Sequence, residues 1–193
     1  MDTLHKTTQT GNAAGNDIVG RDKHVTETVF NFPSHEGCKY IEKLYRELGV
    51  EVQTDEDSLK FIDDLEYYYL PVEGDVQGLE AKLRAGDRTA MLKYGKEAKE
   101  LFHKKLMKTS QFSLVGQRIN LYLLSQVRSF YINKVYPLVC KHENMIVINN
   151  AIEEGIVRPL TSMLGSNELE FTPDEINGML YFLTGNCHVQ WTE

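Results

Sequence analysis

From residue 36 onward the chain repeats one pattern: apolar residues recur every three or four positions, as on one face of an α-helix. Segments of this kind lie at residues 39–48, 55–70, 76–85, 87–108, 111–141, 145–164 and 173–183. Helices with one apolar face must bury it against each other. The sequence therefore predicts a mainly α fold, a helical bundle of six or seven helices with a short N-terminal β arm.

Glycine, proline and capping residues set the expected helix boundaries. Gly49 and Gly86 are expected to end the helices before them, and Pro71 to end the segment 55–70. Asp87 is expected to cap the segment 87–108. Thr172, followed by Pro173 and by an acid three residues after the threonine, predicts a capping box.

Two further expectations concern single segments. Segment 111–141 is apolar on most faces, which is typical of a central helix, and Pro137 is expected to kink or end it. Segment 145–164 is expected to be helical but strained at Gly155 and Pro159. The closing residues 188–191 are expected to add a short final strand.

Residues 1–35 have a different composition from the helical domain at 36–193. Glycine, asparagine and aspartate alternate there with two strand-like segments, at residues 17–19 and 24–32. Two short strands leave their edges open for pairing. We therefore expect the arm to join two copies of the chain, and the expected interface residues are Ile18, Val19, Val25, Val29, Phe30 and Phe32.

Charge is divided into three blocks along the chain. Residues 51–81 hold ten acids and one lysine, residues 82–142 hold thirteen basic residues and three acids, and residues 143–193 hold eight acids and one arginine. One interpretation is that the blocks pair within the fold or between subunits. The alternative is nucleic-acid binding by the basic helix 88–108, with contacts from Lys93, Lys96, Lys99 and Lys104.

Localisation follows from what the sequence does not contain. No run of eighteen apolar residues is present, and the first ten residues lack the apolar core of a secretory signal. The three cysteines, Cys38, Cys140 and Cys187, are an odd number and far apart, so we expect free thiols in a reducing cytoplasm.

Signatures of catalysis are weak. The chain has neither a phosphate-binding glycine loop nor a nucleophile elbow. His35, Cys38, Cys140 and His142 have the residue types of zinc ligands but not the tight paired spacing. Cys187 and His188 are adjacent and so do not face each other.

A metal-dependent hydrolase that uses Asp63, Glu66 or His188 is the weakest alternative, since only residue type favours it. We therefore expect no enzyme activity, no cofactor and no metal.

Three segments carry a resemblance to a known family: the leader TGNAAGNDIVGRDKHV, the segment FIDDLEYY at residues 61–68, and the segment INGMLYFLTGNCH at residues 176–188. Over residues 11–191 the chain resembles a helical C-terminal domain of the ABC-three-component systems. These are bacterial anti-phage operons that pair an SMC/Rad50-type ATPase with a small middle component and an effector. The domain usually ends the effector; here ten residues precede the leader, so we expect a stand-alone or separated copy.

The resemblance implies a role without catalytic residues. We expect a non-enzymatic, oligomerising adaptor or sensor that couples the ATPase complex to an effector. Its expected partners are a second copy of itself, an SMC-like ATPase and an effector protein.

Overall fold

The computed structural model describes residues 35–51, 62–73, 76–165 and 169–193. These residues form helices, turns and irregular segments and contain no strand, so the predicted helical bundle is confirmed. The β arm and its six interface residues lie outside the described residues. So do residues 55–61 of the helix expected at 55–70, whose described part begins at Asp63.

The elements follow one another in a simple order. They are α1 (His35–Val50), α2 (Asp63–Tyr69), α3 (Leu79–Ala85), the 3₁₀ turn η1 (Thr89–Met91), α4 (Leu92–Ser110), α5 (Leu114–Phe130), the π-turn η2 (Tyr131–Val135), α6 (Tyr136–Cys140), α7 (Met145–Ile152), the π-turn η3 (Glu153–Val157), α8 (Arg158–Leu164) and α9 (Pro173–Gly185).

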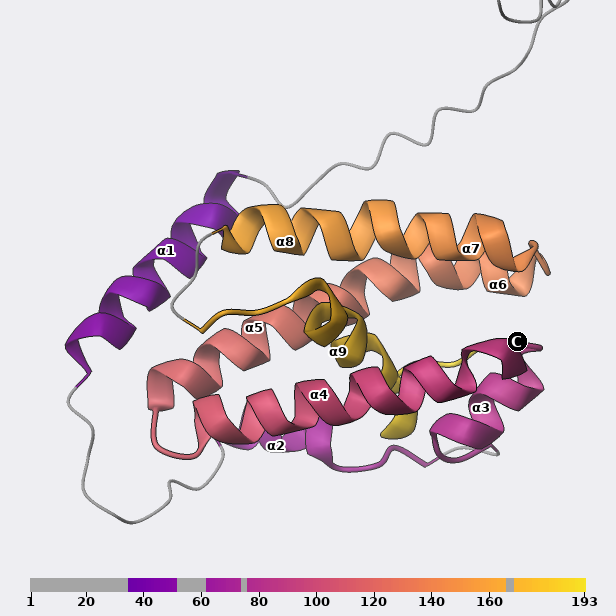
Figure 1. Ribbon diagram of the computed structural model, residues 1–193, viewed down its shortest axis with the longest axis horizontal. Helices are drawn as coiled ribbons and strands as arrows, with labels where there is room; N and C mark the ends of the chain where they lie inside the picture. The colour runs from indigo at the N-terminus through magenta and orange to yellow at the C-terminus, as the bar shows by residue number, and fades with distance from the viewer. Residues whose placement is uncertain (1–34, 52–61, 74–75, 166–168) are drawn as a thin grey trace, which may run out of the picture.

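Helix α9 lies at the centre of the bundle. Figure 1 shows it between α4, which crosses the bundle on one side, and the long rods α5–α6 and α7–α8 on the other. Its buried residues run almost without a break from Glu175 to Thr184. Helix α5, expected to be central, buries one face, and α9 is the more enclosed of the two.

The contact between α4 and α9 depends on Gly178. A Cβ atom at this position would lie 2.2 Å from the carbonyl oxygen of Ala98, so only glycine lets the two backbones come this close. Beside this contact the rings of Phe102 and Phe182 meet edge to face, with centroids 5.4 Å apart. The two helices share the most extensive contact between any two of the described elements.

Both long rods pass through a proline without breaking. Pro137 and Pro159 stand in the first turn of α6 and α8, and each follows a π-turn, η2 or η3. A proline inside a helix removes one N–H and crowds the carbonyl four residues earlier, and a π-turn relieves that crowding. Gly155 in η3 gives room to the Phe130 ring, which would lie 1.8 Å from a Cβ there. The predicted extent 145–164 is confirmed.

Several expected boundaries are confirmed and two are wrong. Leu70, just before Pro71, caps α2, and Gly86 caps α3. The capping box at Thr172 is present in full. Gly49 does not end α1, which runs to Val50.

Asp87 does not cap the helix that follows it. It has φ +56° and belongs to the turn that ends α3, while α4 begins after η1. Asp87 N–H bonds to the Arg84 carbonyl, and Arg88 N–H to the Leu83 carbonyl. These two bonds make a Schellman motif, with Asp87 in the left-handed position that glycine usually takes.

The expected strand at 188–191 is absent, and the segment is held by side chains instead. The Tyr131 hydroxyl donates to the Gln190 carbonyl at 2.6 Å, and the Lys82 ammonium donates to the Val189 carbonyl at 2.8 Å. Trp191 Nε1 donates to Thr184 Oγ1 at 3.2 Å. No neighbouring strand lies within the described residues, so these bonds satisfy the backbone that a sheet would otherwise pair.

The charge blocks pair within the fold. Glu80 from the first acidic block contacts Lys96 at 2.6 Å, and Glu175 from the last contacts Lys105 at 3.4 Å. The lysine and arginine beside Glu80 lower the pKa of its carboxyl to about 2. The first interpretation of the charge pattern is thus supported by ion pairs between blocks.

Candidate functional site

The turn between α6 and α7 is held by local hydrogen bonds and is exposed to solvent. His142 N–H bonds to the Val139 carbonyl at 2.9 Å, and Glu143 N–H to the Leu138 carbonyl at 3.0 Å. This is a second Schellman motif, with His142 at φ +54°. Asn144 then caps α7 by accepting a hydrogen bond from Val147 N–H.

The first turn of α7 presents three apolar side chains to solvent. Met145 is 40% exposed, Ile146 is 70% exposed and Val147 is 37% exposed, and we call these three residues the apolar tip. Ile148, the next residue, is buried and anchors the helix. Three consecutive exposed apolar residues at the end of a rigid rod are typical of a protein contact surface.

Arg88 lies close to the apolar tip, although α4, α5 and α6 separate the two along the chain. The left-handed turn at Asp87 directs the chain out of α3 and places Arg88 against α7 and the C-terminal segment. Its guanidinium carbon lies 4.4 Å from the centre of the Trp191 ring. Its Nη2 donates to Oδ1 of Asn149 in α7.

The Arg88 side chain is buried without an ionic partner. The residue is only 3% exposed, and its Nε has no hydrogen-bond partner. Among the described residues, no carboxylate forms a salt bridge with it. Burial lowers the pKa of the guanidinium, and nearby Tyr181 and Tyr131 oppose that shift.

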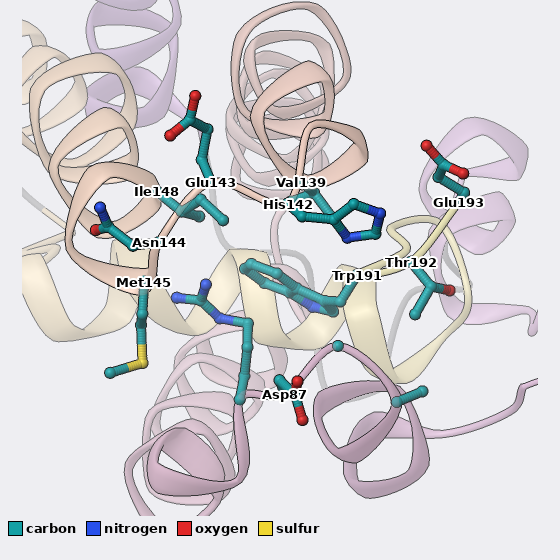
Figure 2. A pocket seen from close by; sticks show the side chains of 13 residues that line it. Asp87, Val139, His142, Glu143, Asn144, Met145, Ile148, Trp191, Thr192 and Glu193 are labelled. Carbon is teal, nitrogen blue, oxygen red and sulfur yellow. The ribbon is translucent and has the colours of Figure 1, made fainter.

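A pocket of about 320 Å³ opens beside Arg88, and we call it the Arg88 pocket. Figure 2 shows the Trp191 ring across its middle, with His142 above the ring, Asp87 below it and Met145 to one side. The apolar tip thus adjoins a cavity with a buried cation in its wall.

Three acidic residues also line this pocket: Asp87, Glu143 and Glu193. In Figure 2 the Glu143 carboxylate points away from the Trp191 ring. The rim of the pocket is therefore acidic, whereas the inner wall contains the arginine.

The four lysines predicted to contact nucleic acid all lie on α4. Lys96 pairs with Glu80, and Lys104 lies 3.5 Å from Glu100. Lys99 is half-buried, which lowers its pKa, whereas Lys93 is exposed. Part of the charge expected to meet phosphates is thus matched by carboxylates, and nucleic-acid binding stays a prediction.

The three residues considered for hydrolysis differ in their exposure to solvent. Asp63 and Glu66 are exposed on α2. His188 is buried, with its ring centroid 4.9 Å from that of Tyr67 and 5.3 Å from that of Tyr68. Burial, assisted by Arg128, lowers the pKa of His188. Backbone groups of Leu70, Tyr67 and Tyr68 oppose this shift but do not meet hydrogen-bond geometry, so burial prevails.

The cysteines are free thiols, as expected. Cys187 ends α9 at φ +66°, and its N–H bonds to the Thr184 carbonyl. In the parts of the chain that the structure describes, no three metal-ligating side chains gather at one point. No helix in those parts has the length and apolar character needed to cross a bilayer.

Sequence reasoning missed the Arg88 pocket and the apolar tip. Arg88 and Trp191 are about a hundred residues apart, and neither carries a local signal for the other. The tip had a signal, since four apolar residues, 145–148, follow the capping residue Asn144 without the usual polar interruption.

Comparison with known families places the domain. The model of CTD9, described as C-terminal domain 9 of the ABC-three component (ABC-3C) systems, matches residues 78–191. The chain matches no curated protein and no solved structure. The matched range begins just before α3 and ends at Trp191, so it includes the segment at 176–188 but neither the leader nor residues 61–68. The match covers more than half of the chain, which therefore belongs to the CTD9 family of C-terminal domains of the ABC-three component systems.

Proposed function

We propose that this chain is a non-enzymatic adaptor that docks onto another protein of an ABC-three component system through the apolar tip. The family serves anti-phage defence as one part of a system of several components. Membership therefore implies protein partners. Coupling of an SMC/Rad50-type ATPase complex to an effector is the specific role we propose.

The exposure of the apolar tip is the observation that supports docking. Placing Ile146 in water while Ile148 is buried has no benefit for the fold, because an exposed apolar side chain contributes little to stability. The Schellman motif and the Asn144 cap hold the tip in one conformation. A preformed surface loses less entropy on binding than a flexible one.

Co-purification tests the proposal. The full chain is co-expressed with the ATPase and the effector of its own system, and a stable complex is expected. Ile146→Asp should weaken the complex by about tenfold or more, since it buries a charge at the contact. Leu101→Glu is the matched control, because Leu101 is an exposed apolar residue on α4.

Two results would contradict the proposal. One is a wild-type chain that binds neither component. The other is an Ile146→Asp variant that binds as well as the Leu101→Glu control. Urea unfolding of both variants checks that each keeps its fold.

Self-association through the arm is a second part of the proposal, and it rests on the sequence. The segments at 17–19 and 24–32 combine strand-forming residues with open edges. Deletion of residues 1–33 should lower the mass measured by light scattering, whereas an unchanged mass would contradict the role of Ile18, Val19, Val25, Val29, Phe30 and Phe32.

A further inference from the structure

We propose that the Arg88 pocket binds an acidic side chain of the docked partner, and that this carboxylate pairs with the Arg88 guanidinium. This inference rests on the proposed function and names the chemistry of the contact. It assigns the partner a glutamate or aspartate that enters the pocket when the apolar tip is covered.

The fold leaves the charge of Arg88 without an ionic partner among the described residues. Burying an ion costs several kcal/mol unless a counter-charge and hydrogen bonds compensate. Arg88 has part of that compensation, from the Asn149 amide and the Trp191 ring. Its Nε N–H has no acceptor. The described residues supply no carboxylate within salt-bridge distance of it.

Arg88 lines a cavity, although its Nε atom is itself buried. The pocket of about 320 Å³ that Arg88 lines is large enough for a side chain to enter. A carboxylate binds arginine through two parallel N–H donors. Arg88 Nε is one donor that has no acceptor, and it is buried in the free chain, so the side chain must shift slightly for the carboxylate to reach it. The geometry thus favours a planar anion over an apolar group at the inner wall.

The rim narrows the choice of ligand. Asp87, Glu143 and Glu193 would repel a polyanion such as nucleic acid, since each adds a negative charge at the entrance. A single carboxylate on a protein segment meets less repulsion, because the rim charges are screened by water and Arg88 is not. Basic residues beside the partner's acid would pair with the rim. The inferred ligand is therefore one acidic side chain flanked by lysine or arginine.

The Arg88 pocket and the apolar tip share a residue and form one continuous surface. Met145 belongs to both, and Ile148 lines the pocket directly behind the tip. A partner that covers the tip would therefore cover the pocket entrance. Burial of the entrance would strengthen the pairing between arginine and carboxylate by excluding water.

The test supplies Arg88 with a carboxylate of its own. In Asn149→Asp the new carboxylate takes the place of the amide that already accepts from Nη2, so it competes with the partner. We expect the variant to keep or raise the melting temperature of the isolated chain. We also expect it to bind the partner complex about thirtyfold more weakly. Asn150→Asp is the matched control, because Asn150 is exposed on the same helix and does not line the pocket.

Arg88→Lys is the second variant, since lysine keeps the positive charge but lacks Nε and the planar fork. Arg158→Lys, on an exposed arginine of α8, controls for loss of any guanidinium. We expect Arg88→Lys to weaken binding at least tenfold and Arg158→Lys to leave it unchanged. A purely structural role of Arg88 would instead lower stability in Arg88→Lys and leave binding by Asn149→Asp intact.

The outcomes separate this inference from the proposed function. If Ile146→Asp weakens the complex while Asn149→Asp and Arg88→Lys bind as wild type does, the pocket assignment is wrong and docking at the tip stands. If the wild-type chain binds no component, both are wrong.

Discussion

The α4–α9 contact and the α6–α7 turn lie in one domain but differ in burial: the first is covered by side chains, and the second is exposed to solvent. Between α4 and α9 a glycine brings two backbones together, and the rings of Phe102 and Phe182 beside it are buried. At the α6–α7 turn, seven consecutive residues, 141–147, are exposed, and apolar side chains remain in water. The first region is arranged for packing, and the second is ordered without being covered.

The difference lies in what holds each region in place. Apolar burial holds α9, so its sequence can change little without loss of stability. Local hydrogen bonds hold the turn, through the Schellman motif and the Asn144 cap. Side chains in such a turn are free to change without unfolding the domain, which suits a surface that recognises a partner.

The largest expected effect is a loss of stability at the α4–α9 contact. Gly178→Ala places a Cβ 2.2 Å from the Ala98 carbonyl oxygen, and a backbone atom cannot rotate away. We expect a loss of about 3 kcal/mol or more in the free energy of unfolding, measured with urea.

Asn177→Ala is the control for that variant, on the half-exposed neighbour of Gly178. It should change stability by less than about 1 kcal/mol. Equal stability of the two variants would show that the helices are not in close contact.

The second expected effect is a loss of stability at lower pH, caused by His188, which follows α9. The pKa of His188 is lowered in the folded state, chiefly by burial, so the unfolded chain binds its proton more readily. The stabilisation is therefore complete above the unfolded pKa, near 6.5, and is lost as the pH falls below that value.

Urea midpoints measured from pH 7.5 to 5.5 test this dependence. The wild-type midpoint should fall over this range. His188→Phe should reduce the fall, whereas His142→Ala, on the exposed turn, should keep it. A wild-type slope retained in His188→Phe would refute the assignment.

A smaller effect is expected at the turn itself. His142 occupies a left-handed position, at φ +54°, where glycine has no steric cost. We expect His142→Gly to stabilise the domain by about 0.5–1 kcal/mol, measured by urea unfolding. Loss of stability would mean that the imidazole contributes contacts that outweigh the backbone strain.

Helix periodicity and local capping signals predicted much of the fold. Thr172 and Glu175 lie three residues apart, and their reciprocal hydrogen bonds form within one turn, so the sequence alone suffices to predict them. Helix periodicity predicts the extent 145–164, but it does not predict the π-turn η3 that precedes Pro159.

The errors arose where distant contacts decide the local structure. Asp87 has the residue type of an N-cap, yet it belongs to the turn that ends α3. Residues 188–191 read as a strand, yet the hydroxyl of Tyr131 and the ammonium of Lys82 satisfy their carbonyls. The Arg88 pocket joins three separate segments, so no single stretch of sequence predicts it.

Hydrogen exchange of the full chain, alone and with the other components of its system, tests the docking surface most directly. The first amides of α7 have no acceptor within the helix, so they exchange readily in the free protein. We expect slower exchange at residues 141–152 in the complex, with the amides of α4 and α9 protected in both states. Unchanged exchange at residues 141–152, or protection confined to other surfaces such as α1, would contradict it.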